Sequence, residues 1–383
     1  MGTNLMFGQR RESRTFLRKI AELNWAMVII TVIIASIGFA MLYSVAGGTF
    51  EPWASRQMIR FAMALVVMIA IALTDVRVWS ALAYPIYAAA FMLLVAVDFV
   101  GITGMGGQRW IDLGFMRLQP SELMKVALVL ALAKYFHGLN MRQSRSVTRL
   151  AVPLLLIGLP AAFIVRQPDL GTMMLLIMGG IAVLFLAGAR IWLFVVGFLG
   201  TVAAIPIGWR FMKDYQKDRI LTFINPESDP LGAGYQIIQS KIALGSGGVF
   251  GKGYLQGTQS HLNFLPEMKT DFIFTVLAEE FGLVGGLFLL FLYMALLTYG
   301  ALVSFGSRSV FGRLLAMGLV VAIFLYVFIN IAMVMGLVPV VGVPLPLVSY
   351  GGSAMLTIMV AYGLILSVAL HRDVSMPRKD PFG

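Results

Sequence analysis

The chain has 383 residues, of which 59% are apolar and only 12% are charged, and it contains no cysteine. Because soluble domains carry about 25% charged residues, this composition excludes an ordinary soluble protein, and the missing cysteines exclude disulfides and thiol chemistry. The formal net charge of +11 is typical of basic cytoplasmic loops that meet anionic lipids, so we expect membrane lipids as partners and no nucleic acid.

Apolar runs that can cross a bilayer recur along the chain after a basic N-terminal segment, residues 1–23. The first four spans are predicted at 24–44, 57–74, 78–97 and 121–136, with a glycine-rich polar loop, 101–120, before the fourth. The fifth span ends at Arg166, the sixth begins at Asp169, and the seventh ends near Arg210. A long polar loop, 212–270, is too rich in glycine and charge to cross, although 235–244 predicts a short amphipathic helix.

The C-terminal part adds three spans, predicted at 271–299, at 314–335 and after residue 352. Between the last two, the proline-rich stretch 336–352 cannot be helical and predicts a re-entrant or capping loop. The predicted fold class is therefore an all-α polytopic membrane protein with about ten transmembrane helices. Residues 24–371 would form a single transmembrane domain, and 372–383 a basic tail.

The charge of the short loops predicts the orientation. With an even number of spans, both termini lie on one side, and the basic clusters of the N-terminal arm, 137–149, 308–313 and the tail share that side. The positive-inside rule makes this side cytoplasmic. The loops at 45–57, 100–120, 167–168, 212–270 and 336–352 are then extracytoplasmic.

Polar residues gather at the predicted outer ends of the spans. Asp271 is the first residue of the eighth span, where a carboxylate is energetically costly. It either serves a reaction or caps the helix, and Thr270 is the alternative cap residue. Glu122 and Lys125 lie three residues apart at the start of the fourth span and can pair. This pair either tethers a short helix, or Glu122 holds the Lys125 ammonium ready to meet a phosphate.

Three other positions allow both a structural and a functional interpretation. Asp169, which follows a proline at the start of the sixth span, is either an ordinary cap or a functional carboxylate. Lys241 either snorkels at the interface or reaches lipid headgroups or a substrate diphosphate. Arg109 and Trp110 are either an interfacial anchor pair or part of a binding site.

Two adjacent glutamates, Glu279 and Glu280, follow Asp271 in the eighth span, roughly 12 Å deeper by helical rise. They need partners from a neighbouring span or a watery cavity. Three carboxylates on one span suit either a proton relay or a site for a hydroxyl-bearing substrate. The sequence has no phosphate-binding loop for ATP and no dinucleotide fingerprint, so an ATP-driven or redox role has no support.

Six blocks stand out along the chain: Gln108–Gly114, Gln119–Leu123, Gln167–Gly171, Gly247–Gly253, Leu265–Gly282 and Pro344–Ser353. In this order they resemble the SEDS family (shape, elongation, division and sporulation) of bacterial membrane peptidoglycan polymerases. Three segments, Gly257–Ser260, Leu277–Glu280 and Pro339–Pro344, resemble its elongation branch rather than its division branch. One departure is Met268-Lys269, where the family commonly has Arg-His.

The resemblance implies a glycosyltransferase of the bacterial inner membrane that polymerises lipid II into glycan strands on the outer face during cell elongation. It implies Asp271 as the essential carboxylate, a general base for the attacking sugar hydroxyl. It also implies a class B penicillin-binding protein, a transpeptidase, and other elongation-complex membrane proteins as partners. A divalent cation, Mg or Mn, would assist the cations at the diphosphate. The expected substrate-binding residues are Arg109, Trp110, Glu122, Lys125, Asp169 and Lys241.

Two other functions remain open from the sequence. A lipid II flippase or other proton-coupled transporter would use Asp271, Glu279 and Glu280 as a proton pathway. The concentration of polar residues at one face and the absence of an internal repeat favour the enzyme. In the third reading, the protein is a scaffold for wall-synthesis proteins and Asp271 is only a cap.

Overall fold

A computed structural model of the chain describes residues 16–104, 107–112, 114, 116–212, 214–228, 233–258 and 267–377. Most of the basic N-terminal arm, the last six residues of the basic tail, Leu113 of the first matching block and Leu265 and Pro266 of the fifth therefore lie outside the described residues.

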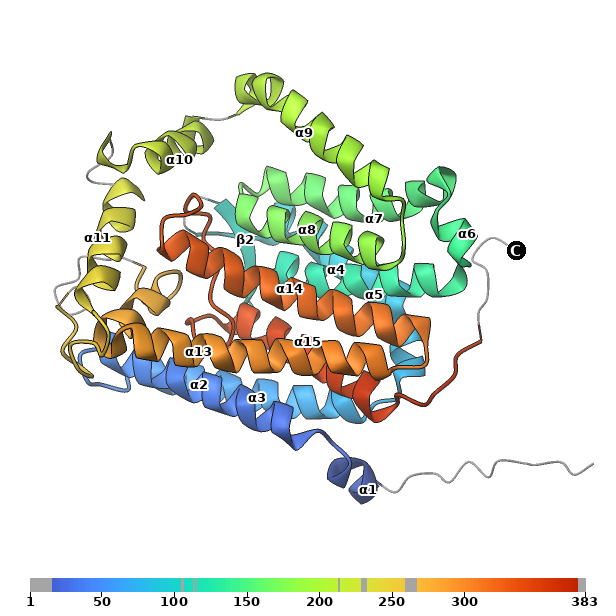
Figure 1. Cartoon of the computed structure of the whole chain (residues 1–383), viewed down its shortest axis with the longest axis horizontal. Coiled ribbons are helices and arrows are strands. Elements are labelled where there is room, and N and C mark those ends of the chain that lie inside the picture. The colour runs from blue at the N-terminus through green and yellow to red at the C-terminus, as the bar shows by residue number, and fades with distance from the viewer. Residues whose placement is uncertain are drawn as a thin grey trace, which may run out of the picture.

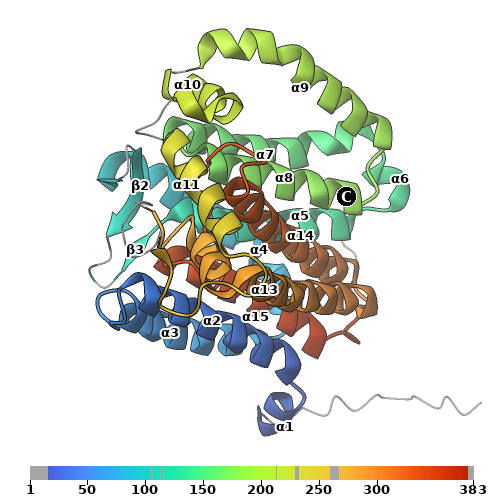
Figure 2. The same ribbon diagram turned by 60° about the vertical axis from the view of Figure 1, so that its left-hand side comes forward.

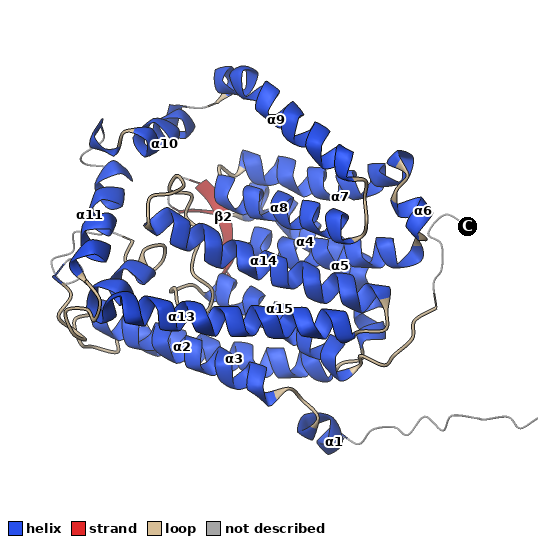
Figure 3. Cartoon of the chain, viewed as in Figure 1, coloured by secondary structure: helices blue, strands red, loops and turns tan. Residues whose placement is uncertain are grey.

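The described part is almost entirely helical, which confirms the predicted all-α membrane class (Figure 3). Eight helices in this part are long and apolar enough to span a membrane: α2 (Trp25–Val45), α3 (Ala54–Leu73), α4 (Val76–Val100), α7 (Val147–Arg166), α9 (Ile191–Phe211), α13 (Ile273–Gly306), α14 (Val310–Val334) and α15 (Gly352–Leu370).

Two further apolar helices complete the predicted set of spans. Helix α5 (Pro120–Gly138) carries charged residues near both ends, and α8 (Leu170–Leu186) has 17 residues. The predicted total of about ten requires that both of them also cross the bilayer.

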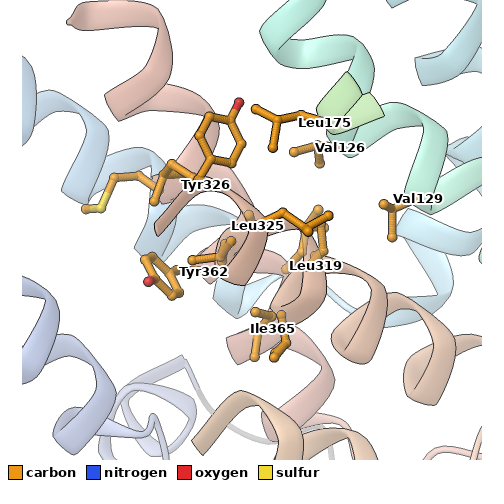
Figure 4. Close-up of a cluster of buried hydrophobic side chains, with 14 of the residues drawn as sticks. Val126, Val129, Leu175, Leu319, Leu325, Tyr326, Tyr362 and Ile365 are labelled. Carbon is orange, nitrogen blue, oxygen red and sulfur yellow. The ribbon is translucent and has the colours of Figure 1, made fainter. Parts of the chain in front are cut away.

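Helix α14 lies at the centre of the bundle and packs against α5, α8, α13 and α15 (Figure 1). Helix α5 is buried on nearly all sides, so its charged side chains must find partners within the protein. Figure 4 shows the apolar cluster where these central helices meet. Its labelled residues are Val126, Val129, Leu175, Leu319, Leu325, Tyr326, Tyr362 and Ile365.

The loops divide between the two ends of the bundle as the sequence predicts. The short helices α1 (Phe16–Ala21) and α6 (Met141–Ser144) lie at one end, together with the last described residues (Figure 1). The opposite end holds a small antiparallel sheet and the segment between α9 and α13 (Figure 1). We refer to this second end, which carries the predicted extracytoplasmic loops, as the outer end.

The outer loops contain more regular structure than the sequence indicates. The stretch 101–120, predicted as a glycine-rich polar loop, forms three antiparallel strands: β1 (Ile102–Gly104), β2 (Gly107–Asp112) and β3 (Arg117–Leu118). The long loop contains α10 (Asp214–Ile224), a single 3-10 turn (Pro226–Ser228) and α11 (Ala233–Ser246), which includes the predicted amphipathic helix. Figure 2 shows α9 and α10 arching away from the rest of the bundle.

The eighth span is not the single continuous helix that the sequence predicts. Gly282 has φ 65° and ψ −159°, so the helix is interrupted there. This break divides α13 into a short first part and a long span that ends at Gly306. The glycine-rich stretch before residue 253 packs against this break. A Cβ on Gly282 would lie 2.4 Å from the Gly251 nitrogen, so only glycine allows the two backbones to approach this closely.

The proline-rich stretch 336–352 is non-helical up to Gly351, as predicted, and enters the protein rather than covering it. Val343, Leu345 and Val348 are at most 2% exposed. The Tyr293 hydroxyl on α13 donates to the Pro346 carbonyl at 2.5 Å, which satisfies one polar backbone group of this buried loop. We call this segment the re-entrant loop.

Candidate functional site

The backbone around Asp271 is fixed by three consecutive hydrogen bonds. The carbonyl of Lys269 accepts from the Tyr350 amide at 2.8 Å, and that of Thr270 accepts from the Ser349 hydroxyl at 2.5 Å. The Asp271 carbonyl accepts from the Asn330 side-chain amide of α14 at 2.8 Å. The re-entrant loop and α14 therefore hold the position of this carboxylate.

The predicted capping role of Thr270 or Asp271 is wrong. The helix begins at Ile273 after the cap residue Phe272, and no side chain caps it. The Thr270 hydroxyl instead donates to the Glu267 carboxylate at 2.8 Å, within the preceding turn. The carboxylate of Asp271 is therefore left available for another purpose.

The pKa of Asp271 is raised to about 7, mainly because burial desolvates the carboxylate. The negative charges of Glu267 and Asp169 contribute to this rise, whereas the Arg219 guanidinium on α10 opposes it. Asp271 is partly exposed. A partly exposed carboxylate with a pKa near neutrality can take up and release a proton at physiological pH.

Glu122 and Lys125 form the predicted ion pair, with 2.6 Å between Oε1 and Nζ. Both residues are at most 5% exposed. The Tyr326 hydroxyl of α14 donates to the second Glu122 oxygen at 2.5 Å, and the Lys125 ammonium lies 4.3 Å from the centre of the Tyr326 ring. The pair is thus enclosed by its own partners, as the tethering interpretation expects, and the predicted contact of Lys125 with a phosphate stays a prediction.

Asp169 both caps α8 and joins the fourth span to the sixth. Its carboxylate accepts from the Thr172 amide at 3.2 Å and from the Gln119 side chain at 2.8 Å. The Arg109 guanidinium lies 3.9 Å from the same carboxylate and donates to the main-chain carbonyls of Gln167 and Pro168. Arg109 therefore helps to fix the turn before α8.

Helix α14 contacts both Glu122 and the backbone of Asp271. Tyr326, which contacts Glu122, and Asn330, which holds the Asp271 backbone, are one helical turn apart and share a face of α14. The negative charge of Asp169 contributes to the raised pKa of Asp271, so these two carboxylates belong to one site. The sequence prediction that Glu122, Asp169 and Asp271 share the outer end of the bundle is confirmed.

Trp110 and Arg109 lie on opposite faces of β2 and do not form one binding site. Successive residues of a strand point to opposite faces, so Arg109 on β2 faces the start of α8 while Trp110 and Asp112 line a cavity on the other face. Lys241 lies on the exposed side of α11, next to Gly336 of the re-entrant loop. Its predicted role stays a prediction.

Glu279 and Glu280 find partners in two different segments, the glycine-rich stretch and α2. Glu279 pairs with Lys252 at 2.7 Å and accepts from the Thr258 hydroxyl at 3.0 Å. Glu280 accepts a hydrogen bond from Ser44, in the last turn of α2. Both glutamates lie before the break at Gly282, and Glu280 reaches the outer end of α2; their expected depth of roughly 12 Å below Asp271 stays a prediction.

Four residues of the site were not singled out from the sequence: Arg219, Glu267, Tyr326 and Asn330. A signal existed for two of them, because Tyr326 and Asn330 carry polar groups inside an apolar span. Arg219 and Glu267 lie in a segment already rich in charge, where no local pattern distinguishes them.

Among the described residues, no three histidine, cysteine, aspartate or glutamate side chains gather as a metal site. A divalent cation at Asp271 would therefore complete its coordination with water and substrate oxygens. Mg²⁺ commonly binds in this way, through one or two carboxylates and the substrate's phosphates.

Comparison with known proteins gives matches over nearly the whole chain. Residues 23–374 match the family model for the cell cycle proteins FtsW, RodA and SpoVE. The peptidoglycan glycosyltransferase MrdB of Escherichia coli K12 is 46% identical over 365 residues, covering 94% of this chain and 97% of MrdB. The peptidoglycan glycosyltransferase RodA of Treponema pallidum is 30% identical, covering 92% and 98%.

Solved structures agree with this result. A chain from a peptidoglycan synthase complex that coordinates polymerization and crosslinking is 33% identical, with a TM-score of 0.80 over 91% of this chain and 98% of that one. The rod shape determining protein RodA of Thermus thermophilus is 28% identical, with a TM-score of 0.69 over 92% and 98%.

Proposed function

This chain belongs to the FtsW, RodA and SpoVE family of cell cycle proteins and is a peptidoglycan glycosyltransferase of the bacterial inner membrane, and we propose that it polymerises lipid II with Asp271 as its general base. One observation carries the role of Asp271. It is a partly exposed carboxylate on an anchored backbone, and desolvation raises its pKa to about 7. A base with a pKa near the working pH accepts a proton readily, while a substantial fraction of the molecules still carries the ionised form.

In the proposed reaction, a hydroxyl of one lipid-linked sugar attacks the anomeric carbon of another. The Asp271 carboxylate accepts the hydroxyl proton as the new glycosidic bond forms. The bond between the anomeric carbon and the diphosphate breaks, and the polyprenyl diphosphate leaves with the bonding electrons. Displacement with inversion requires the base and the leaving group on opposite faces of the sugar.

The anchored backbone supports this assignment because a base must be held close to its target proton. The carbonyls of residues 269–271 are all engaged by the re-entrant loop and α14. Positioning of this kind lowers the entropic part of the barrier. Glu122 and Asp169 would stabilise the surroundings of Asp271 through Tyr326 and Gln119 rather than react themselves.

We retain Mg or Mn as a proposed cofactor at the diphosphate, where it would neutralise the charge that develops on the leaving group. The Asp271 carboxylate is a hard oxygen ligand suited to such an ion, which would take its remaining ligands from water and substrate oxygens. A transpeptidase of the penicillin-binding class is the proposed partner, because the related chain of known structure comes from a complex that couples polymerization to crosslinking. Other elongation-complex membrane proteins are further proposed partners.

The test is polymerisation of purified lipid II by the protein together with its transpeptidase. We compare the wild type with Asp271→Asn, which keeps the shape of the side chain and removes its basicity. Loss of the base should lower the rate by roughly 10²- to 10⁴-fold. Normal polymer from a well-folded Asp271→Asn variant would remove Asp271 from this role, and passage of lipid II across vesicles without polymer would favour a flippase.

A further inference from the structure

The cavity at the outer end that Trp110 and Asp112 line has the opposite charge to the Asp271 site. It has a volume of about 630 Å³ and lies where α3, strands β2 and β3, and the segments at 269–270 and 350–352 meet. Its lining includes four basic side chains against one carboxylate, Asp112, which leaves a net charge of +3. The basic residues are Arg56, Arg60, Arg117 and Lys269.

Two of these cations are fixed in place by aromatic rings. The Arg60 guanidinium lies 4.9 Å from the centre of the Tyr350 ring, and the Lys269 ammonium lies 4.9 Å from the centre of the Trp53 ring. A cation–π contact orients the charge without consuming its N–H donors, which remain able to bind an anion. Arg56 has only a distant carboxylate partner, Glu51 at 3.9 Å, and both of these side chains are more than 60% exposed. Such exposed pairs contribute little.

Two of the three expected substrate-binding cations are engaged within the protein, and the third, Lys241, lies on the exposed side of α11 beside the re-entrant loop. Lys125 is 5% exposed and paired with Glu122. Arg109 is committed to Asp169 and to main-chain carbonyls at the start of α8. The surroundings of Asp271 are themselves rich in carboxylates, which would repel a diphosphate. Even with the Arg219 guanidinium nearby, two further carboxylates act on Asp271, so a site of net positive charge suits the leaving group better.

The lipid-facing surface of α3 indicates what kind of anion reaches the cavity. Arg56 and Arg60 lie one turn apart in the first part of α3, at its outer end. Ile59, Met63 and Val66 continue the same side of the helix toward the other end, and they are 62%, 48% and 68% exposed. A ligand with an anionic head and a long apolar tail would match both parts of this surface.

We propose that this cavity binds the diphosphate of a lipid-linked sugar substrate, with the polyprenyl tail lying along α3. The guanidinium forks of Arg56, Arg60 and Arg117 suit phosphate oxygens, and Lys269 supplies a further charge. Trp110 and Tyr350 offer aromatic surfaces to the attached sugars. Thr270 lines the cavity and Asp271 follows it directly in the chain, so the diphosphate site adjoins the proposed base.

This assignment rests on the proposed function, and the experiment separates the two. The full-length protein is placed in nanodiscs of zwitterionic lipid, and binding of polyprenyl diphosphate without sugars is titrated. The test variants are Arg60→Gln with Lys269→Gln, and Arg117→Gln alone, because the Arg117 side chain is exposed and the substitution keeps the main-chain carbonyl that accepts from Ser353. Arg308→Gln at the other end of the bundle is the matched control, since its pairing with Asp373 is also exposed.

We expect the Arg60→Gln, Lys269→Gln variant to bind polyprenyl diphosphate about tenfold more weakly or worse, and to show a matching rise in KM for lipid II. Arg117→Gln should show a smaller loss, and Arg308→Gln should behave as wild type. The charge-preserving pair Arg60→Lys, Lys269→Arg should recover most of the affinity. Asp271→Asn should bind the probe normally while it fails to polymerise.

Wild-type affinity in both cavity variants would overturn the proposal. Equal displacement of the probe by phosphatidylglycerol would also overturn it, and would make the cavity a phospholipid headgroup site. Equal displacement by inorganic diphosphate would remove the role of the α3 surface. If the cavity variants lose affinity but Asp271→Asn still polymerises, the diphosphate site stands and the base assignment fails.

Discussion

The buried ion pair of α5 yields a quantitative prediction about stability. Replacing Glu122 by Gln removes the charge that lies 2.6 Å from the Lys125 ammonium, in surroundings where both residues are at most 5% exposed. Breaking a buried pair from one side costs roughly 3–5 kcal/mol, because the remaining charge has no compensation. We expect a loss of this size for Glu122→Gln and for Lys125→Met, measured by chemical unfolding in detergent micelles.

Removing both charges should be less harmful than removing one. The double variant Glu122→Leu, Lys125→Met leaves no buried charge, but the Tyr326 hydroxyl loses the oxygen to which it donates at 2.5 Å. An unsatisfied buried hydroxyl costs about 1–3 kcal/mol. Adding Tyr326→Phe removes this cost, so the triple variant should unfold near the wild-type denaturant concentration.

The activity of the triple variant then decides between the two interpretations of the pair. A stable, active triple variant means that Glu122 and Lys125 only tether the helix, whereas a stable, inactive one means that they serve the reaction. Single variants that remain within about 1 kcal/mol of wild type would refute the energetic reasoning, since they would show that the pair is not desolvated.

Further predictions concern the Asp271 site and the break in α13. The polymerisation rate should rise with pH through about 7 as Asp271 loses its proton, and Glu267→Gln should move the midpoint to lower pH because the Glu267 charge raises this pKa. Because the pKa of Asp271 is higher in the folded than in the unfolded protein, ionisation of this carboxyl destabilises the fold, and the stability present at low pH is lost as pH rises through about 7. Asp271→Asn should therefore raise the melting temperature at pH 8 but not at pH 4, and an equal effect at both would contradict the linkage. Asn330→Leu removes the donors to two main-chain carbonyls and should lower kcat more than it changes KM; an unchanged kcat would show that the anchor is dispensable. Gly282→Ala should destabilise the protein by about 2 kcal/mol or more in thermal unfolding, whereas the control Gly200→Ala, with open space around its Cβ position, should not.

Local patterns determined much of the functional site in advance. Glu122 and Lys125 were predicted to pair because residues three apart on a helix share a face, and they do. Asp169 was predicted to begin a helix after a proline, and it caps α8. These predictions succeeded because each depends on residues close in sequence. The capping role of Asp271 failed because the re-entrant loop and α14, both distant in sequence, fix the turn before the helix.

The sequence by itself determined the class of the protein, the order of its spans and the gathering of polar groups at one end. Apolar length and loop charge settle these features locally, since the bilayer imposes its thickness on every segment alike. Only the tertiary structure decided which polar groups meet. It separates Arg109 from Trp110, attaches Glu279 to Lys252 and breaks the helix at Gly282. These outcomes depend on close approach between segments far apart in the chain, and no local pattern of hydrophobicity encodes that approach.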